Sequence, residues 1–193
     1  MGRLLARRFA VILGLTLGCN AGSSTNTPQV GPAPAAAEPK LEVQAVRWPA
    51  PATIDQRVRA GLPARALATI AQAPVPVLVP PDAALLTHAQ VVVEPAFYAL
   101  STRDAGVTVS LHATRMAYRH DDIATAHVAA TPLRGGRGFV TVNENVRSAS
   151  WVENGTSYVL DVECTNARDA RCQDDAYLLG LVEHLVYVGG SGR

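Results

Sequence analysis

The densest group of side chains that can do chemistry lies in one short stretch. His120, Asp121 and Asp122 are consecutive, and His127 follows after four small or apolar residues. Histidine and carboxylate groups together can bind zinc or transfer protons. The intervening residues give no defined ligand spacing, however, and the same stretch suits an exposed polar loop between strands. The sequence leaves both interpretations open: an exposed loop, and the site of a hydrolase or metal-dependent enzyme.

The remaining reactive side chains form no recognisable catalytic group. No serine stands in a Gly-x-Ser-x-Gly context, so the sequence shows no motif for a serine nucleophile of a hydrolase. The glycine-rich run from Arg134 to Gly138 follows no predicted strand and begins no predicted helix, so it lacks the mechanism by which such loops hold phosphates. We interpret it as a flexible connector. The sequence predicts no cofactor, no metal and no catalytic residue.

The first residues have the pattern of an export signal. Arg3, Arg7 and Arg8 precede an apolar run from Phe9 to Leu17. A helix of this length reaches only ~13 Å, whereas the hydrocarbon core of a membrane is roughly 30 Å thick. The run therefore predicts a signal peptide rather than a membrane-spanning helix.

The end of this run, Leu15-Thr16-Leu17-Gly18-Cys19, resembles the lipobox of bacterial lipoproteins. Gly18 and Cys19 match the two most restrictive positions, while Thr16 and Leu17 depart from the commonest residues. The resemblance implies cleavage before Cys19, a diacylglycerol on its thiol and, usually, a third acyl chain on its amino group. Several acyl chains anchor a protein stably, since each buried methylene contributes ~0.8 kcal/mol. An ordinary secretory signal cleaved elsewhere is the alternative.

The resemblance also assigns the three cysteines. Lipid on Cys19 leaves Cys164 and Cys172 as a pair, and an oxidising compartment makes that pair a disulfide. Asn20, rather than Asp, follows Cys19, which in families that sort lipoproteins by this residue implies the outer membrane. The expected location is the cell envelope, with the domain in the periplasm or at the cell surface.

Composition limits the partners. The formal net charge is +1 and the basic residues are scattered, which argues against a nucleic-acid surface. The expected partners are the membrane, through the acyl chains, and an envelope protein or apolar ligand whose identity the sequence does not give.

The chain divides into three expected parts. Residues 1–18 are the signal peptide, 19–52 a Pro/Ala-rich tether, and 53–193 a single globular domain. Within the tether, the alternation of Leu41, Val43 and Ala45 fits a strand that joins the domain.

Periodicity predicts the elements of that domain. Helices are expected over 53–62 and 64–72, briefly after Asp82, and from Asp174 to the glycines at 189 and 190. Strands are expected over 75–79, 90–94, 97–103, 107–119, 139–142, 149–152 and 158–164. Turns at Asp104-Ala105-Gly106 and Asn154-Gly155 join pairs of these strands into hairpins.

These elements predict an α+β domain with an antiparallel sheet of roughly six strands and helices on one face. The leading functional hypothesis is a lipid-anchored, non-enzymatic envelope protein that binds a protein, peptide or apolar ligand. A purely structural surface lipoprotein also fits, as does the enzyme that would use the segment from His120 to His127.

Overall fold

The computed structural model of the protein describes residues 40–119 and 130–192. All of these residues belong to one compact unit, residues 36–193. Two features of the sequence analysis, Cys19 of the lipobox and the segment from His120 to His127, lie outside the described residues.

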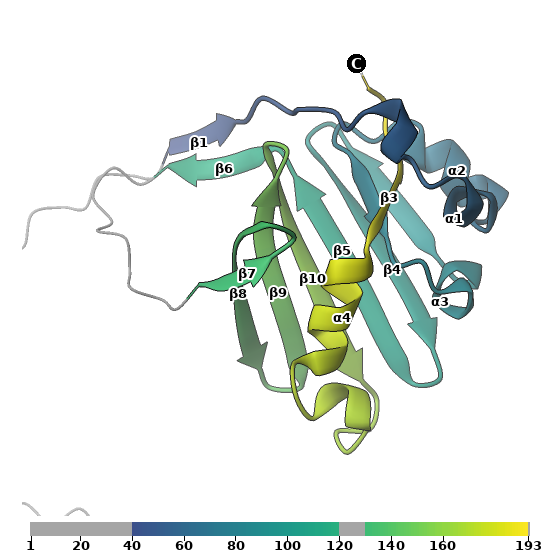
Figure 1. Ribbon diagram of the computed structural model, residues 1–193, viewed down its shortest axis with the longest axis vertical. Coiled ribbons are helices and arrows are strands. Elements are labelled where there is room, and N and C mark those ends of the chain that lie inside the picture. Colours follow the sequence, from purple (N-terminus) through teal and green to yellow (C-terminus); the bar gives the residue numbers. More distant parts are fainter. Residues whose placement is uncertain (1–39, 120–129, 193) are drawn as a thin grey trace, which may run out of the picture. The chain divides into compact units, whose positions relative to one another are not determined.

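A seven-stranded antiparallel sheet dominates the described part of the protein (Figure 1). Its strands are β3 (Gln90–Glu94), β4 (Phe97–Asp104), β5 (Val107–Thr114), β7 (Thr131–Leu133), β8 (Gly136–Asn143), β9 (Val146–Glu153) and β10 (Thr156–Cys164). They lie in the order β3-β4-β5-β10-β9-β8-β7. The antiparallel sheet is as predicted, but it has seven strands instead of roughly six. Strand residues outnumber helical ones, so the fold is mostly β rather than a balanced α+β.

The helices are short. They are α1 (Gln56–Ala60), α2 (Ala64–Ile70), α3 (Ala83–Thr87) and α4 (Ala176–His184), with 3-10 turns η1 (Pro51–Thr53) and η2 (Ala170–Cys172). In Figure 1, α4 crosses in front of β9 and β10, while α2 and α3 lie toward β3 and β4. Asp55 and Asp82 cap α1 and α3 by accepting hydrogen bonds from backbone N–H groups of their first turns.

The core lies between the sheet and α4. Alternate side chains of the central strands are buried on this covered face, because successive residues of a strand point to opposite sides. On β5 the buried residues are Val107, Val109, Leu111 and Ala113, as the alternation predicts. We call the other side of the sheet the open face.

The C-terminal helix is shorter than expected. The apolar stripe that predicted a helix up to Gly189 divides: α4 ends at His184, and β11 (Val186–Gly189) follows as a strand. It pairs with β2 (Val77–Val79), whose three residues are all buried. The prediction failed because Val186-Tyr187-Val188 suits either structure locally, and the partner strand decides between them.

The expected strand over 107–119 bends into two parts. After β5 the chain breaks at Arg115 and continues as β6 (Met116–Arg119), which pairs with β1 (Lys40–Val43) in a two-stranded ribbon (Figure 1). The strand suggested by the alternation near Leu41 is therefore present. Beyond it, the Arg47 N–H donates to the Asn154 carbonyl at 2.9 Å, so this segment crosses the β9–β10 turn.

Candidate binding surface

The open face carries regular rows of small, mostly uncharged side chains. Strand register aligns one residue from each of six neighbouring strands into a row. One row is Val92, Ala99, His112, Val159, Ser150 and Phe139. The next is Gln90, Ser101, Ser110, Asp161, Ser148 and Thr141. Asp161 is the only acidic residue in the two rows, and it accepts a hydrogen bond from the Ser148 hydroxyl at 2.6 Å.

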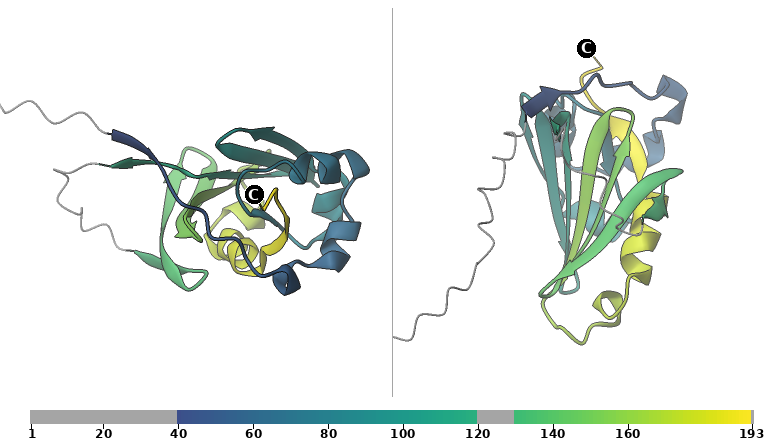
Figure 2. Two further views of the ribbon diagram at one scale, coloured as in Figure 1. Left: turned by 90° about the horizontal axis from the view of Figure 1, so that it is seen from above. Right: turned by 90° about the vertical axis from the view of Figure 1, so that its left-hand side faces the viewer.

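Large apolar side chains on this face remain accessible. Val152 is 64% exposed and Val92 is 56% exposed, and Phe97 and Phe139 also reach solvent. The four lie on four different strands, β9, β3, β4 and β8. In the described part of the protein, the helices cover only the opposite side of the sheet (Figure 2). The open face is thus a surface of mostly small polar side chains on which separate large apolar residues are accessible.

A cleft of about 340 Å³ lies where this face meets the ribbon. We call it the ribbon cleft. Val152 and Ser157 line it from the β9–β10 hairpin, and Tyr118, itself 66% exposed, lines it from β6. Its other lining residues are Glu42, Gln44, Ala117 and Gly155. Val152 and Tyr118 make part of the lining apolar, and the remaining lining residues are small or polar. Such a lining suits a peptide side chain better than a charged small molecule.

Gly155 fixes the ribbon against the hairpin. Its φ is +73°, and a Cβ on this residue would overlap the carbonyl oxygen of Ala45. Only glycine meets both requirements, the left-handed backbone of the turn and the close approach of the crossing segment. The walls of the ribbon cleft therefore depend on this residue.

A polar network holds the same hairpin from the covered side. Arg134 donates from Nε to Glu153 Oε2 at 2.6 Å, and Trp151 Nε1 donates to the same oxygen at 3.2 Å. The Tyr187 hydroxyl donates to Glu153 Oε1 and accepts from Asn154 Nδ2. The network links the β7–β8 hairpin, the β9–β10 hairpin and β11. It therefore fixes the tip of the β9–β10 hairpin, which lines the ribbon cleft.

Arg134 also caps α4. Its Nη1 donates to the carbonyl oxygens of Val182 and Leu185 at 3.2 and 2.8 Å, and its guanidinium lies over the Tyr187 ring. A cation beside the free carbonyls of a helix C-terminus is favourable. The glycine-rich run was expected to be a flexible connector, but it is the type I′ turn that places this arginine: Arg134 has φ +48° and Gly135 has φ +76°.

The network sets the charge state of its carboxyl group. Burial alone would raise the pKa of Glu153, but hydrogen bonds from Arg134 and Tyr187 outweigh it and hold the pKa below its usual value. Burial, and then the hydrogen bond donated to Glu153, raise the pKa of the Tyr187 hydroxyl. The pair is therefore an ionised carboxylate with a neutral phenol, an arrangement that stabilises the fold.

The aromatic residues of the hairpin pack internally. The rings of Trp151 and Tyr158 are stacked with centroids 5.3 Å apart and planes 14° apart, and both residues are buried. The Tyr158 hydroxyl donates to the Pro76 carbonyl at 2.8 Å. These two side chains thus form a cross-strand pair of the core and not a contact surface.

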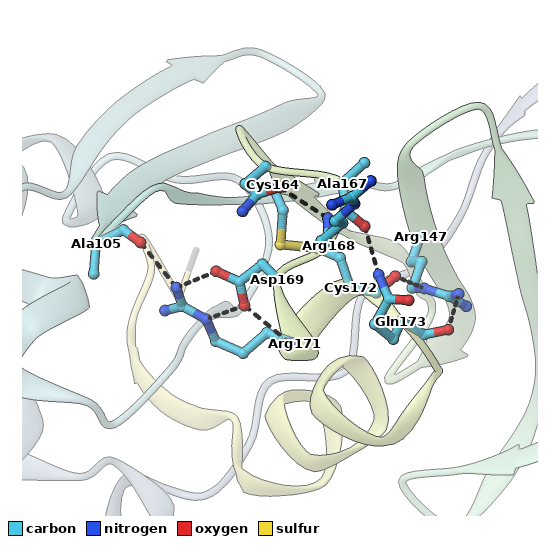
Figure 3. Close-up of a disulfide and its surroundings, with 10 residues drawn as sticks. Ala105, Arg147, Cys164, Ala167, Arg168, Asp169, Arg171, Cys172 and Gln173 are labelled. Atoms are coloured by element: carbon cyan, nitrogen blue, oxygen red, sulfur yellow. Dashed lines mark hydrogen bonds and ion pairs between the residues drawn. A yellow bond between two sulfur atoms is a disulfide. The ribbon is translucent and has the colours of Figure 1, made fainter.

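Cys164 and Cys172 lie at disulfide distance, with Cα atoms 6.2 Å apart (Figure 3). They join the end of β10 to η2, just before α4. Arg147 of β9 donates to the Cys172 and Gln173 carbonyls at 2.9 and 2.8 Å and forms an ion pair with Asp175. In Figure 3 the pair and this arginine flank the same turn, so the segment entering α4 is attached to two strands.

The structure therefore describes only part of the predicted site residues. It brings Cys164 and Cys172 together, whereas Cys19 and the residues from His120 to His127 are not described. Within residues 40–119 and 130–192, no three His, Cys, Asp or Glu side chains gather as metal ligands. The described ranges also hold no helix with the length and apolar character to cross a membrane.

The sequence analysis missed the network around Arg134 and Glu153. A local signal existed, because Arg-Gly-Gly after a short apolar run resembles a hairpin turn as well as a loop. Its partners on α4 and β11 are about fifty residues away and carry no matching motif.

Comparison of the chain with protein-family models, curated proteins and solved structures found no match.

Proposed function

We propose that this protein is a lipid-anchored lipoprotein of the bacterial cell envelope whose domain binds a protein or peptide through the open face and the ribbon cleft. The observation that carries the binding part is the exposed valine and tyrosine lining of that cleft, next to a sheet face that no described helix covers. The lipobox ending at Cys19 supports the anchoring part.

The chemistry of the surface favours a protein partner. Interface cores are enriched in aromatic and apolar side chains, and Tyr118 and Val152 supply such side chains in the ribbon cleft. Exposed apolar side chains that lie close together mark interaction sites, and Val152 and Tyr118 line one cleft. The described pockets are open surface clefts. An extended peptide therefore fits them better than a small apolar ligand that needs an enclosed cavity.

Intact mass tests the anchoring. The protein is extracted from membranes of a bacterial host, with and without an inhibitor of signal peptidase II. The expected mass starts at Cys19 and includes acyl chains, and the inhibitor leaves residues 1–18 attached. A mature mass without acyl chains, or cleavage at another residue, would contradict the proposal.

Cross-linking from one side chain tests the binding surface. A photoreactive residue in place of Val152 is expected to give a defined adduct in cells, whereas the same residue at Thr87, exposed on α3, is not. The partner is then purified, and its affinity measured for Val152→Asp and for Thr87→Asp as a matched control. We expect at least a tenfold loss for the first variant alone, about 1.4 kcal/mol. Equal affinities would place the binding site elsewhere.

Hydrolase activity provides the opposing test. Turnover of a generic ester or peptide substrate that disappears with His120→Ala, while the melting temperature is unchanged, would replace the binding proposal with the enzymatic one.

A further inference from the structure

The ribbon of β1 and β6 has an inner and an outer side. Glu42 and Gln44 are half-buried and line the ribbon cleft, and Val46 packs against the core. The residues that alternate with them are exposed, because successive side chains of an extended chain point to opposite sides. We call the side that carries these exposed residues the outer side of the ribbon.

The outer side is an apolar row that ends in a cation. Leu41 is 51% exposed and Val43 is 60% exposed. Tyr118, which is 66% exposed, lies opposite Leu41 in the register, so its side chain leaves the ribbon on the same side, at the rim of the cleft. Arg47 continues the exposed alternation beyond β1. The only acidic residue of the two strands, Glu42, lies on the inner side.

This row lies on the first described element after the proposed anchor. Residues 20–39 join Cys19 to Lys40, where β1 begins. A chain of this length spans at most roughly 70 Å. In Figure 1 the ribbon projects from the seven-stranded sheet, beyond the end of β5. Acyl chains on Cys19 would therefore keep the ribbon within reach of the membrane surface.

We infer that the outer side of the ribbon docks on the phospholipid surface of the membrane that holds the anchor. The side chains of Leu41 and Val43 enter the boundary between headgroups and acyl chains, and the Arg47 guanidinium faces the lipid phosphates. Tyr118 suits the same boundary, because its ring is apolar and its hydroxyl is polar. This inference rests on the proposed lipid anchor.

The size of the row favours a lipid surface over a protein partner. A stable protein interface buries roughly 800 Å² on each partner, more than so short a row supplies. A lipid contact needs less area, since the anchor already holds the ribbon near the membrane and makes the contact effectively intramolecular. A few apolar side chains beside a cation then suffice for shallow insertion.

Fluorescence quenching by labelled lipid tests the contact. Val43→Cys carries an environment-sensitive fluorophore in the lipidated full-length protein, reconstituted into vesicles of phosphatidylethanolamine and phosphatidylglycerol. With Cys19 acylated and Cys164 bonded to Cys172, the introduced cysteine is the only free thiol. The matched control is Val92→Cys, because this valine on β3 is 56% exposed and lies in the seven-stranded sheet, away from the ribbon.

Spin-labelled phospholipid is expected to quench the fluorophore on Val43→Cys about twofold or more and to leave the one on Val92→Cys unchanged. Adding Arg47→Glu to the first variant should weaken the quenching, because a carboxylate then faces the lipid phosphates. Equal quenching of both cysteine variants, or none of Val43→Cys, would overturn the inference. A blue-shifted emission of Val43→Cys without quenching by lipid would also overturn it, since protein would then cover the row.

Intact mass on the same samples separates this inference from the anchor. Acylated protein without quenching of Val43→Cys rejects only the docking. In protein without acyl chains, quenching by added vesicles rejects only the anchor, and the absence of quenching rejects both.

Discussion

Arg134 and Glu153 form an ion pair although they belong to two different hairpins, the first between β7 and β8 and the second between β9 and β10. Their side chains are only 12% and 20% exposed. The arginine also bonds the end of α4, and the carboxylate bonds Tyr187 of β11. This one pair therefore connects the sheet, the helix that covers it and the C-terminal strand.

Removing the arginine is expected to destabilise the domain strongly. Arg134→Ala leaves the Glu153 carboxylate without its cation and the α4 carbonyls without a donor, which costs about 3 kcal/mol. Urea unfolding followed by tryptophan fluorescence measures the loss. Arg65→Ala, an exposed arginine on α2, is the control and should leave the midpoint unchanged. A loss of less than 1 kcal/mol for Arg134→Ala would mean that the network contributes little to stability.

Acid should destabilise the protein through Glu153. A carboxyl group whose pKa is lowered by folding stabilises the native state above its unfolded value, and that contribution is lost as the pH falls through the folded pKa. We therefore expect the unfolding free energy to fall from about pH 4.5 downward. Urea midpoints from pH 3 to 7 measure the profile, and Glu153→Gln should be less stable at pH 7 with a flatter slope below pH 4.5. Parallel profiles for both proteins would refute this assignment.

Reduction should lower the melting temperature only of proteins that retain both Cys164 and Cys172. Closing so short a loop restricts the unfolded chain by about 2 to 3 kcal/mol in the entropy model. Without reductant, Cys164→Ser is therefore expected to melt at a lower temperature than the unsubstituted protein. With dithiothreitol, the two proteins should melt at nearly the same temperature. Oxidised and reduced wild-type protein that melt at the same temperature would show that the pair is not bonded in solution.

Two glycines in similar turns should respond differently to alanine. Gly106 has φ +81° and open space around its Cα, so Gly106→Ala costs about 1 kcal/mol from backbone conformation alone. Gly155→Ala adds the overlap with Ala45 and should cost about 3 kcal/mol. The difference in urea unfolding free energy measures how tightly the ribbon packs on the hairpin. Equal losses would indicate that the segment around Ala45 moves away without penalty.

The sequence predicted the parts of the fold that short-range chemistry determines. Asn154-Gly155 and Ala105-Gly106 require left-handed backbone and so identified their turns, and the alternation along β5 identified its buried side. The disulfide-distance pair followed from the cysteine count once the lipobox resemblance assigned Cys19 to lipid.

Long-range pairing determined the rest. No residue near Val186 indicates that β2 lies beside it, so the sequence pattern predicts that the helix continues through the residues after α4. Arg134 was assigned to a connector because its partners lie on α4 and β9. The open face could not be foreseen either, since its side chains become a surface only when six strands align.

The pairing of β11 with β2 has a consequence for how the protein is made. Leu78, at the centre of the buried strand β2, finds its partner Tyr187 only after nearly all the intervening chain has emerged. Synthesis proceeds from the N-terminus, so the first half of the domain is made before its core can close. Such a delay makes folding slow and dependent on β11, the last strand to be made.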